Sequence, residues 1–65
     1  MMKYYYVSFK NRAGREVFGL WRYAESPERA IYLADAFCSV VYPTKYSPDL
    51  IAVVERESLT AGISL

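Results

Sequence analysis

Few residues of this chain have side chains that could carry out catalytic chemistry. Histidine, the commonest general acid and base, is absent. The one cysteine, Cys38, could act as a nucleophile only beside an activating base or cation, and its place on the apolar side of a predicted helix favours a buried structural thiol. The carboxylates are scattered and are interpreted as solvated surface: Glu16, Glu25, Glu28, Asp35, Asp49, Glu55 and Glu57. We therefore predict a protein that is not an enzyme, with no metal site and no cofactor.

A short basic cluster is the first candidate binding site. Lys10, Arg12 and Arg15 lie close together in the sequence, at the predicted tip of a hairpin. With aromatic side chains nearby, such a cluster could contact nucleic acid or an acidic partner. The net charge is only +1, whereas strong nucleic-acid binders are far more positive. Nucleic-acid binding is therefore the alternative hypothesis, and a charged turn that only aids solubility is the simpler interpretation.

A group of aromatic residues is the second candidate site. Tyr4, Tyr6, Trp21 and Tyr23 are expected on one face of a sheet, with Arg22 beside them. Tyrosine, tryptophan and arginine are enriched in the cores of protein interfaces and are frequent hot-spot residues. The sequence therefore favours a protein-binding surface. A self-association surface, or one covered by the C-terminal tail, is the competing interpretation.

Two predicted strands position both candidate sites. The strands are expected at residues 2–10 and 15–23, and residues 11–14 join them as a turn in which Gly14 takes a positive φ. Neighbouring side chains of a strand point to opposite faces. The more aliphatic face is interpreted as core and carries Tyr5, Val7, Phe9, Phe18 and Leu20. The other face carries Tyr4, Tyr6, Ser8, Val17, Gly19, Trp21 and Tyr23.

A helix follows the hairpin. Ser26 is a good N-cap and Pro27 suits the first helical position. The helix should end before Pro43, near Val40, because the residue before a proline avoids helical geometry. Apolar residues at spacings of three and four predict a buried stripe, with Ile31 and Cys38 at its margins: Ala30, Leu33, Ala34, Phe37 and Val41.

The last predicted element is a third strand at residues 50–56, after a loop at residues 43–48. The order strand, strand, helix, strand predicts an α+β fold, ββαβ, with a three-stranded antiparallel sheet in the order 2-1-3. One helix packs on the face with Tyr5, Val7 and Phe9 and leaves the other face open. Residues 58–65 are predicted to be a flexible tail or to dock on a neighbour.

The length predicts a single small domain, residues 1–65. A chain of this size buries only about 60% of its unfolded surface, and a single cysteine cannot form an internal disulfide. Because 54% of the residues are hydrophobic, we expect a second copy of the chain, in a homodimer, or a partner protein to bury the apolar surface that a chain of this size leaves exposed. We expect no transmembrane segment and no signal peptide, and we predict a cytoplasmic protein with no membrane partner.

The layout resembles a known class of small proteins. A tyrosine-rich hairpin, then Ala24-Glu25-Ser26-Pro27-Glu28-Arg29-Ala30, a single amphipathic helix and a last strand look like many very small phage and mobile-element proteins. Some anti-CRISPR proteins are similar in length and layout. The resemblance implies a non-enzymatic inhibitor that blocks a surface of a bacterial host complex. A nucleic-acid-binding module and a homo-oligomeric structural subunit are the alternatives.

Overall fold

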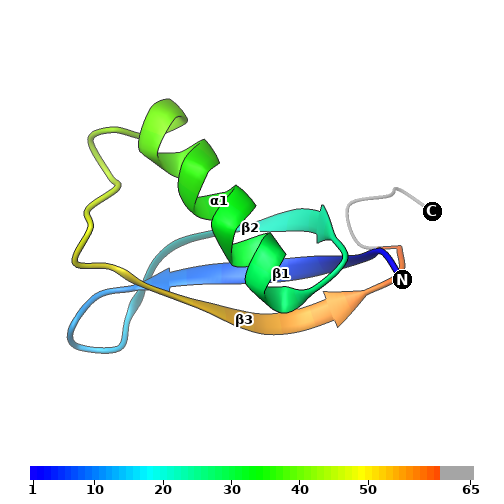
Figure 1. The fold of residues 1–65 in the computed structure, drawn as a ribbon. Helices are drawn as coiled ribbons and strands as arrows, with labels where there is room; N and C mark the ends of the chain where they lie inside the picture. The colour runs from blue at the N-terminus through cyan, green and yellow to red at the C-terminus, as the bar shows by residue number, and fades with distance from the viewer. Residues whose placement is uncertain (61–65) are drawn as a thin grey trace.

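The computed structural model describes residues 1–60, and Figure 1 displays the order of its elements. These are β1 (Lys3–Lys10), β2 (Glu16–Ala24), α1 (Pro27–Val41) and β3 (Ile51–Ser58). The strands form one antiparallel sheet in the order β2-β1-β3. The predicted ββαβ fold, the sheet order and the α+β class are confirmed. Ser58 of the predicted tail belongs to β3, and residues 61–65 of that tail lie outside the described residues.

The turn between β1 and β2 is held by an asparagine and a glycine. The Asn11 side-chain oxygen accepts hydrogen bonds from the backbone N–H groups of Ala13, at 3.0 Å, and Arg15, at 3.1 Å. Gly14 has a φ of 82°, the left-handed conformation that glycine adopts without steric cost. The prediction for Gly14 is confirmed. Where β2 begins, the pairing shifts by one residue, so that Lys10 lies opposite Glu16 and Phe9 opposite Phe18.

Helix α1 begins where the capping residues predicted. The Ser26 side chain accepts a hydrogen bond from the backbone N–H of Arg29, and Pro27 occupies the first turn. At the other end, the Tyr42 N–H bonds to the Cys38 carbonyl at 2.9 Å. The helix therefore ends at Val41, close to the predicted end.

The buried stripe of α1 is narrower than the sequence predicted. Its fully buried residues are Ala30, Ala34 and Cys38, which recur every four positions. Small side chains at these positions let the helix lie close to the sheet. The prediction that Phe37 and Val41 are buried is wrong, because they lie beside this line of contact and are 38% and 48% exposed.

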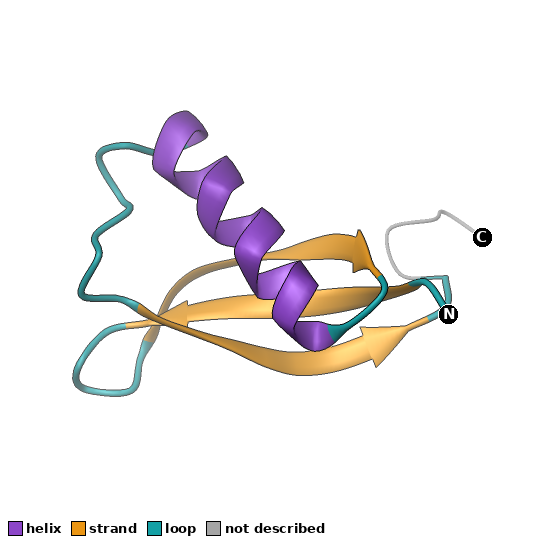
Figure 2. Cartoon of the chain, in the orientation of Figure 1, coloured by secondary structure: helices purple, strands orange, loops and turns teal. Residues whose placement is uncertain are grey.

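Figure 2 shows α1 lying over one face of the sheet, and the core residues lie between the two. Tyr5, Val7 and Phe9 of β1 are the buried residues on this face. The ring of Phe9 stacks on that of Phe18 with 4.8 Å between centroids. No element of residues 1–60 covers the opposite face of the sheet.

Candidate functional site on the open face of the sheet

Two aromatic pairs cross from β1 to β2 on the sheet face away from α1, which we call the open face. Tyr4 lies opposite Tyr23, with ring centroids 4.7 Å apart, and Tyr6 lies opposite Trp21, with centroids 5.3 Å apart. Such tilted and edge-to-face pairs stabilise a sheet surface beyond the area they bury. The sequence therefore placed these four aromatic residues together correctly. Their role in binding a partner stays a prediction.

Arginine 56 of β3 extends this surface. Arg56 lies opposite Tyr6 across the β1–β3 pairing. Its guanidinium lies 4.7 Å from the centroid of the Tyr6 ring and 5.7 Å from that of Trp21. A cation at these distances is attracted by the faces of both rings. Arg56 therefore holds the central aromatic pair in place from the third strand.

Glu16 fixes the polar end of Tyr6. The Tyr6 hydroxyl donates to one carboxylate oxygen of Glu16 at 3.0 Å, and the Ser8 hydroxyl donates to the other at 2.7 Å. Hydrogen bonds from Ser8 and then Tyr6 lower the pKa of Glu16 below its usual value. Burial, followed by the bond to Glu16, raises the pKa of Tyr6. The carboxylate also satisfies the hydroxyl of Ser8, which is fully buried.

Gly19 makes room for the ring of Tyr6. A Cβ atom at position 19 would lie 2.3 Å from the Tyr6 hydroxyl oxygen and 2.5 Å from its ring carbon Cζ. The tyrosine therefore lies across β2 directly over the glycine and reaches Glu16 beyond it. An aromatic ring that covers a glycine of a neighbouring strand is a known way to protect a sheet at that point.

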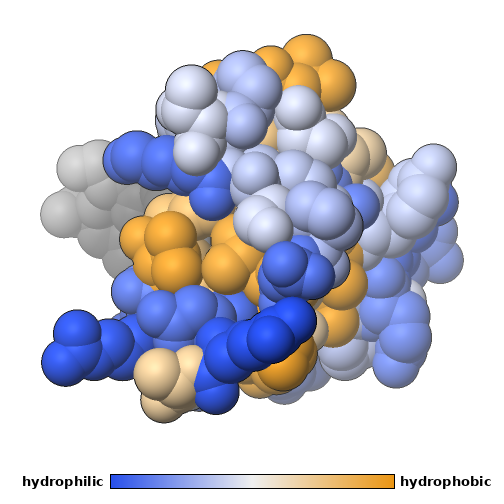
Figure 3. Space-filling model, turned by 90° about the vertical axis from the view of Figure 1, so that its left-hand side faces the viewer, coloured by the Kyte–Doolittle hydropathy of each residue, from blue (hydrophilic) through white to orange (hydrophobic). Residues whose placement is uncertain are grey.

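The charges around the open face are balanced. Lys10 forms an ion pair with Glu55, and Arg56 shares the face with Glu16. The other two members of the predicted basic cluster, Arg12 and Arg15, are exposed in the turn between β1 and β2. Figure 3, viewed from this end, shows a mostly hydrophilic lower part, where the turn lies, and hydrophobic atoms at the top, where α1 ends. The three basic residues therefore do not form one free cationic patch.

Arg22 lies on the other side of the sheet from the four aromatic residues of the open face, and its role in binding a partner stays a prediction. It lies opposite Tyr5, so its side chain points toward α1. There its guanidinium covers the ring of Phe37 at 4.2 Å from the centroid. Alternation along a strand accounts for the difference, because Arg22 stands between Trp21 and Tyr23 and must point to the other face.

Cys38 is buried, as predicted. Burial raises the pKa of its thiol, which disfavours the nucleophilic thiolate. Within residues 1–60, no group of three or more histidine, cysteine or carboxylate side chains lies close enough to hold a metal ion.

Comparisons with known proteins do not assign the chain to a class. No protein-family model matches it, and neither a curated protein nor a solved structure does. In the described part of the chain, no helix has both the length and the apolar character needed to cross a bilayer.

Three residues that shape the open face were missing from the predicted site, although Gly19 was predicted to lie on this face. Arg56 comes from β3, whose register on β1 contains a shift between Tyr6 and Val7 that no local pattern announces. Glu16 was interpreted as solvated surface, and the irregular pairing at the start of β2 brings it to Ser8. Gly19 did carry a signal, because a glycine inside an aromatic strand often marks a close approach.

Proposed function

We propose that the protein is a non-enzymatic protein-binding module whose contact surface is the open face. The observation that carries this proposal is the fixed arrangement of Tyr6 between Trp21, Arg56 and Glu16. Side chains already held by their neighbours lose little conformational freedom when a partner binds. The edge of the surface is also apolar, since Tyr23 is 50% exposed and Ile51 57% exposed.

The chemistry of the surface favours a protein over a nucleic acid. Binding to a phosphate backbone depends on an excess of cations. On the open face, Arg56 and Lys10 are matched by Glu16 and Glu55. Aromatic residues with polar tips are typical anchors at protein interfaces and are frequent hot spots.

In its finer form, the proposal is that the partner belongs to a bacterial host complex and that binding blocks one of its surfaces. Support comes from the chain length of 65 residues and the ββαβ layout, which resemble those of small phage and mobile-element inhibitors. A protein of this kind would act in the host cytoplasm. Self-assembly through the same face is the outcome that would replace this proposal.

The test compares two aromatic substitutions in a capture experiment. Trp21→Ala removes a central ring of the open face, and Tyr32→Ala removes a ring on α1 that is 61% exposed and serves as the matched control. Each tagged protein is incubated with nuclease-treated bacterial lysate, and the affinity for any captured protein is then measured with purified components. We expect Trp21→Ala to weaken binding about thirtyfold, the loss typical of a hot spot, and Tyr32→Ala to leave it unchanged.

Other outcomes would contradict the proposal in distinct ways. Equal binding by the Trp21→Ala variant would remove the open face as the contact surface. Recovery of nucleic acid alone from the untreated lysate, lost on reversing the charges of Arg12 and Arg15, would favour the nucleic-acid hypothesis. A stable dimer that Trp21→Ala dissociates, with no other protein captured, would favour self-assembly.

A further inference from the structure

A groove runs along the seam between β2 and α1, on the side of the sheet away from the open face. One hollow of about 150 Å³ is lined by Phe18, Gly19, Leu20, Tyr42 and Lys45. A second, of about 330 Å³, is lined by Arg22, Tyr23, Leu33 and Phe37. The rings of Phe37 and Tyr42, one from each hollow, lie 6.1 Å apart. The two hollows are therefore neighbours along one groove, whose floor on β2 consists of Phe18, Leu20 and Arg22.

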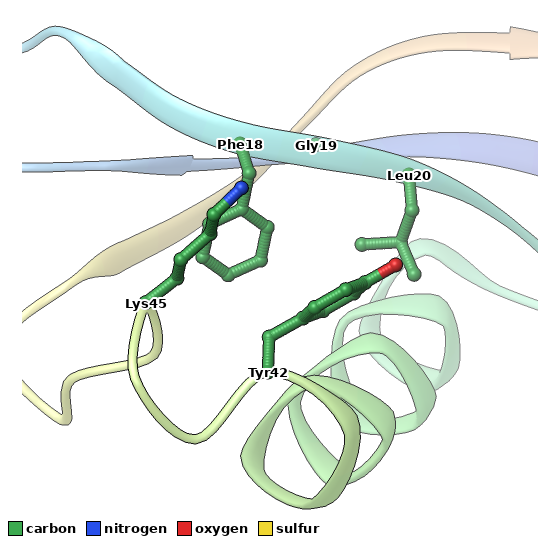
Figure 4. A pocket seen from close by; sticks show the side chains of 5 residues that line it. All are labelled: Phe18, Gly19, Leu20, Tyr42 and Lys45. Atoms are coloured by element: carbon green, nitrogen blue, oxygen red, sulfur yellow. The ribbon is translucent and has the colours of Figure 1, made fainter.

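The groove carries two cations and no matching carboxylate. The buried Nε atom of Arg22 has no hydrogen-bond partner. Lys45 reaches from the loop after α1 toward β2 beside Phe18, while Tyr42 extends toward Leu20 (Figure 4). Within residues 1–60, the ion pairs are Lys3 with Glu57 and Lys10 with Glu55, so neither groove cation is paired. The guanidinium of Arg22 therefore lacks an acidic partner among residues 1–60, and a carboxylate from outside would pair with the part of the group that solvent reaches.

The groove is bordered by β2, whose outer edge is a free edge of the sheet. β2 is an outer strand, nine residues long and without proline, and no described strand pairs with its outer side. An outer strand presents unpaired backbone N–H and C=O groups that can accept another strand. Peptide binding by strand addition uses these groups for affinity and adjacent pockets for alternate side chains of the peptide.

We propose that the outer edge of β2 and this groove bind an extended segment of a partner protein that carries an apolar side chain between two acidic ones. Residues at positions i, i+2 and i+4 of an added strand face the same side and span about 13 Å. That span matches the distance along β2 from Phe18 to Arg22, which is also four residues. An acidic residue at i meets Arg22, an apolar residue at i+2 lies over Leu20, and an acidic residue at i+4 meets Lys45.

The charges argue against a second copy of this chain as the occupant. Pairing β2 with β2 of another copy would gather two Arg22 and two Lys45 side chains along one seam. The carboxylate of β2 itself, Glu16, is already engaged by Ser8 and Tyr6 on the opposite face. A foreign segment with its own carboxylates has no such conflict.

The probe for this proposal is a capped synthetic peptide, Thr-Glu-Thr-Leu-Thr-Glu-Thr. Its sequence reads the same in both directions, so it tests parallel and antiparallel addition together. It is titrated into the ¹⁵N-labelled protein, and amide shifts are followed by NMR. We expect saturable shifts concentrated in β2 and around Lys45. The same peptide with lysine in place of both glutamates should cause no such shifts.

Two variants with the same change in charge sharpen the test. Lys45→Glu lies in an exposed loop and should fold normally, and Arg12→Glu places the identical change in the turn between β1 and β2. We expect Lys45→Glu to weaken peptide binding about fivefold or more, and Arg12→Glu to have less than a twofold effect. Arg22→Gln should weaken binding similarly, because it removes the other cation.

The proposal is overturned by any of three results. These are the absence of β2 shifts at millimolar peptide, equal binding of the lysine peptide, and equal losses in the Lys45→Glu and Arg12→Glu variants. Shifts of β2 that depend on protein concentration without peptide would identify a second copy as the occupant. Lys45→Glu changes a side chain of the groove, whereas Trp21→Ala changes a ring of the open face, so the two experiments test different side chains.

Discussion

Three consecutive tyrosines of β1 divide between the two sides of the sheet and experience opposite surroundings. Tyr5 points toward α1 and is only 4% exposed, within the core. Tyr4 and Tyr6 point to the open face, where they contact Tyr23, Trp21 and other side chains of the surface. Residue type is the same in each case, so position along the strand alone decides whether a tyrosine serves the core or the surface.

The two sides also differ in what holds them together. On the α1 side, small residues of the helix allow close packing over large residues of β1, and the contacts are apolar. On the open face, the rings are fixed by contacts with one another, by Arg56 and by the hydrogen bonds of Glu16. We conclude that the α1 side supplies most of the stability, whereas the open face is organised by contacts among its own side chains.

The largest predicted effect tests this division directly. Phe9→Ala removes a ring that is 1% exposed and should cost about 3–5 kcal/mol, because it leaves a cavity under α1. A domain of this size rarely has more than about 3–5 kcal/mol of stability, so the variant should be unfolded. Trp21→Ala should cost only about 1–2 kcal/mol and remain folded. Circular dichroism during urea unfolding checks both, and a Trp21→Ala variant less stable than Phe9→Ala would reverse the comparison.

A smaller loss of stability is expected at Gly19, where the ring of Tyr6 occupies the space that a side chain would need. Gly19→Ala places a methyl group against the ring of Tyr6, which Glu16, Trp21 and Arg56 hold in position. The ring must move and lose those contacts, at a cost of about 1–2 kcal/mol. Thermal or urea unfolding measures the loss.

A double-mutant cycle separates this steric effect from any general effect of alanine in β2. In the Tyr6→Ala background the ring is absent, so Gly19→Ala should be neutral or slightly stabilising, because glycine is unfavourable inside strands. An equal loss of stability in both backgrounds would mean that β2 needs glycine at position 19 for its own backbone. The contact between Gly19 and the ring of Tyr6 would then contribute nothing.

Alternation and capping account for the part of the fold that the sequence predicted correctly. The period of two in β1 and β2 placed Tyr4, Tyr6, Trp21 and Tyr23 on one face and Val7 on the other. Ser26 and Pro27 located the start of α1. These are local signals, in which each residue is interpreted with its immediate neighbours. The same alternation assigns Arg22 to the α1 side, away from its sequence neighbours Trp21 and Tyr23.

The remaining features depend on contacts between distant segments. The register shifts opposite Lys10 and Val7 decide where Glu16 and Arg56 lie, and neither shift has a local sequence pattern. The exposure of Phe37 follows from how α1 rests on the sheet through Ala34 and Cys38, which periodicity alone does not determine. Sequence reasoning therefore identified the aromatic half of the candidate site and missed the charged half.

The smallest predicted effect is a dependence of stability on pH, and it comes from Glu16 of the open face. The pKa of Glu16 is lowered in the folded protein by the bonds from Ser8 and Tyr6, with Lys10 and Arg56 adding to the effect. A group whose folded pKa is lowered contributes stability above its unfolded pKa, and that stability is lost as pH falls through the folded value. The contribution of Glu16 should therefore be complete at neutral pH and disappear below its usual pKa of 4.5. Glu16→Gln should remove this part of the pH dependence of the free energy of unfolding and leave the contributions of the other carboxylates unchanged.

Trp21 provides the measurement, because it is the only tryptophan and lies against Tyr6. Its fluorescence, followed from pH 7 downward, should change before α1 unfolds, as protonated Glu16 releases the Tyr6 hydroxyl. Circular dichroism follows the helix in the same samples, and the Glu16→Gln variant should lack the early fluorescence change. If fluorescence and dichroism changed together in both proteins, the open face would have no independent organisation, and the contrast between the two sides of the sheet would fail. If the fluorescence transition precedes the dichroism transition in the unmodified protein, and the two coincide in Glu16→Gln, the Glu16 carboxylate is the group that fixes the open face.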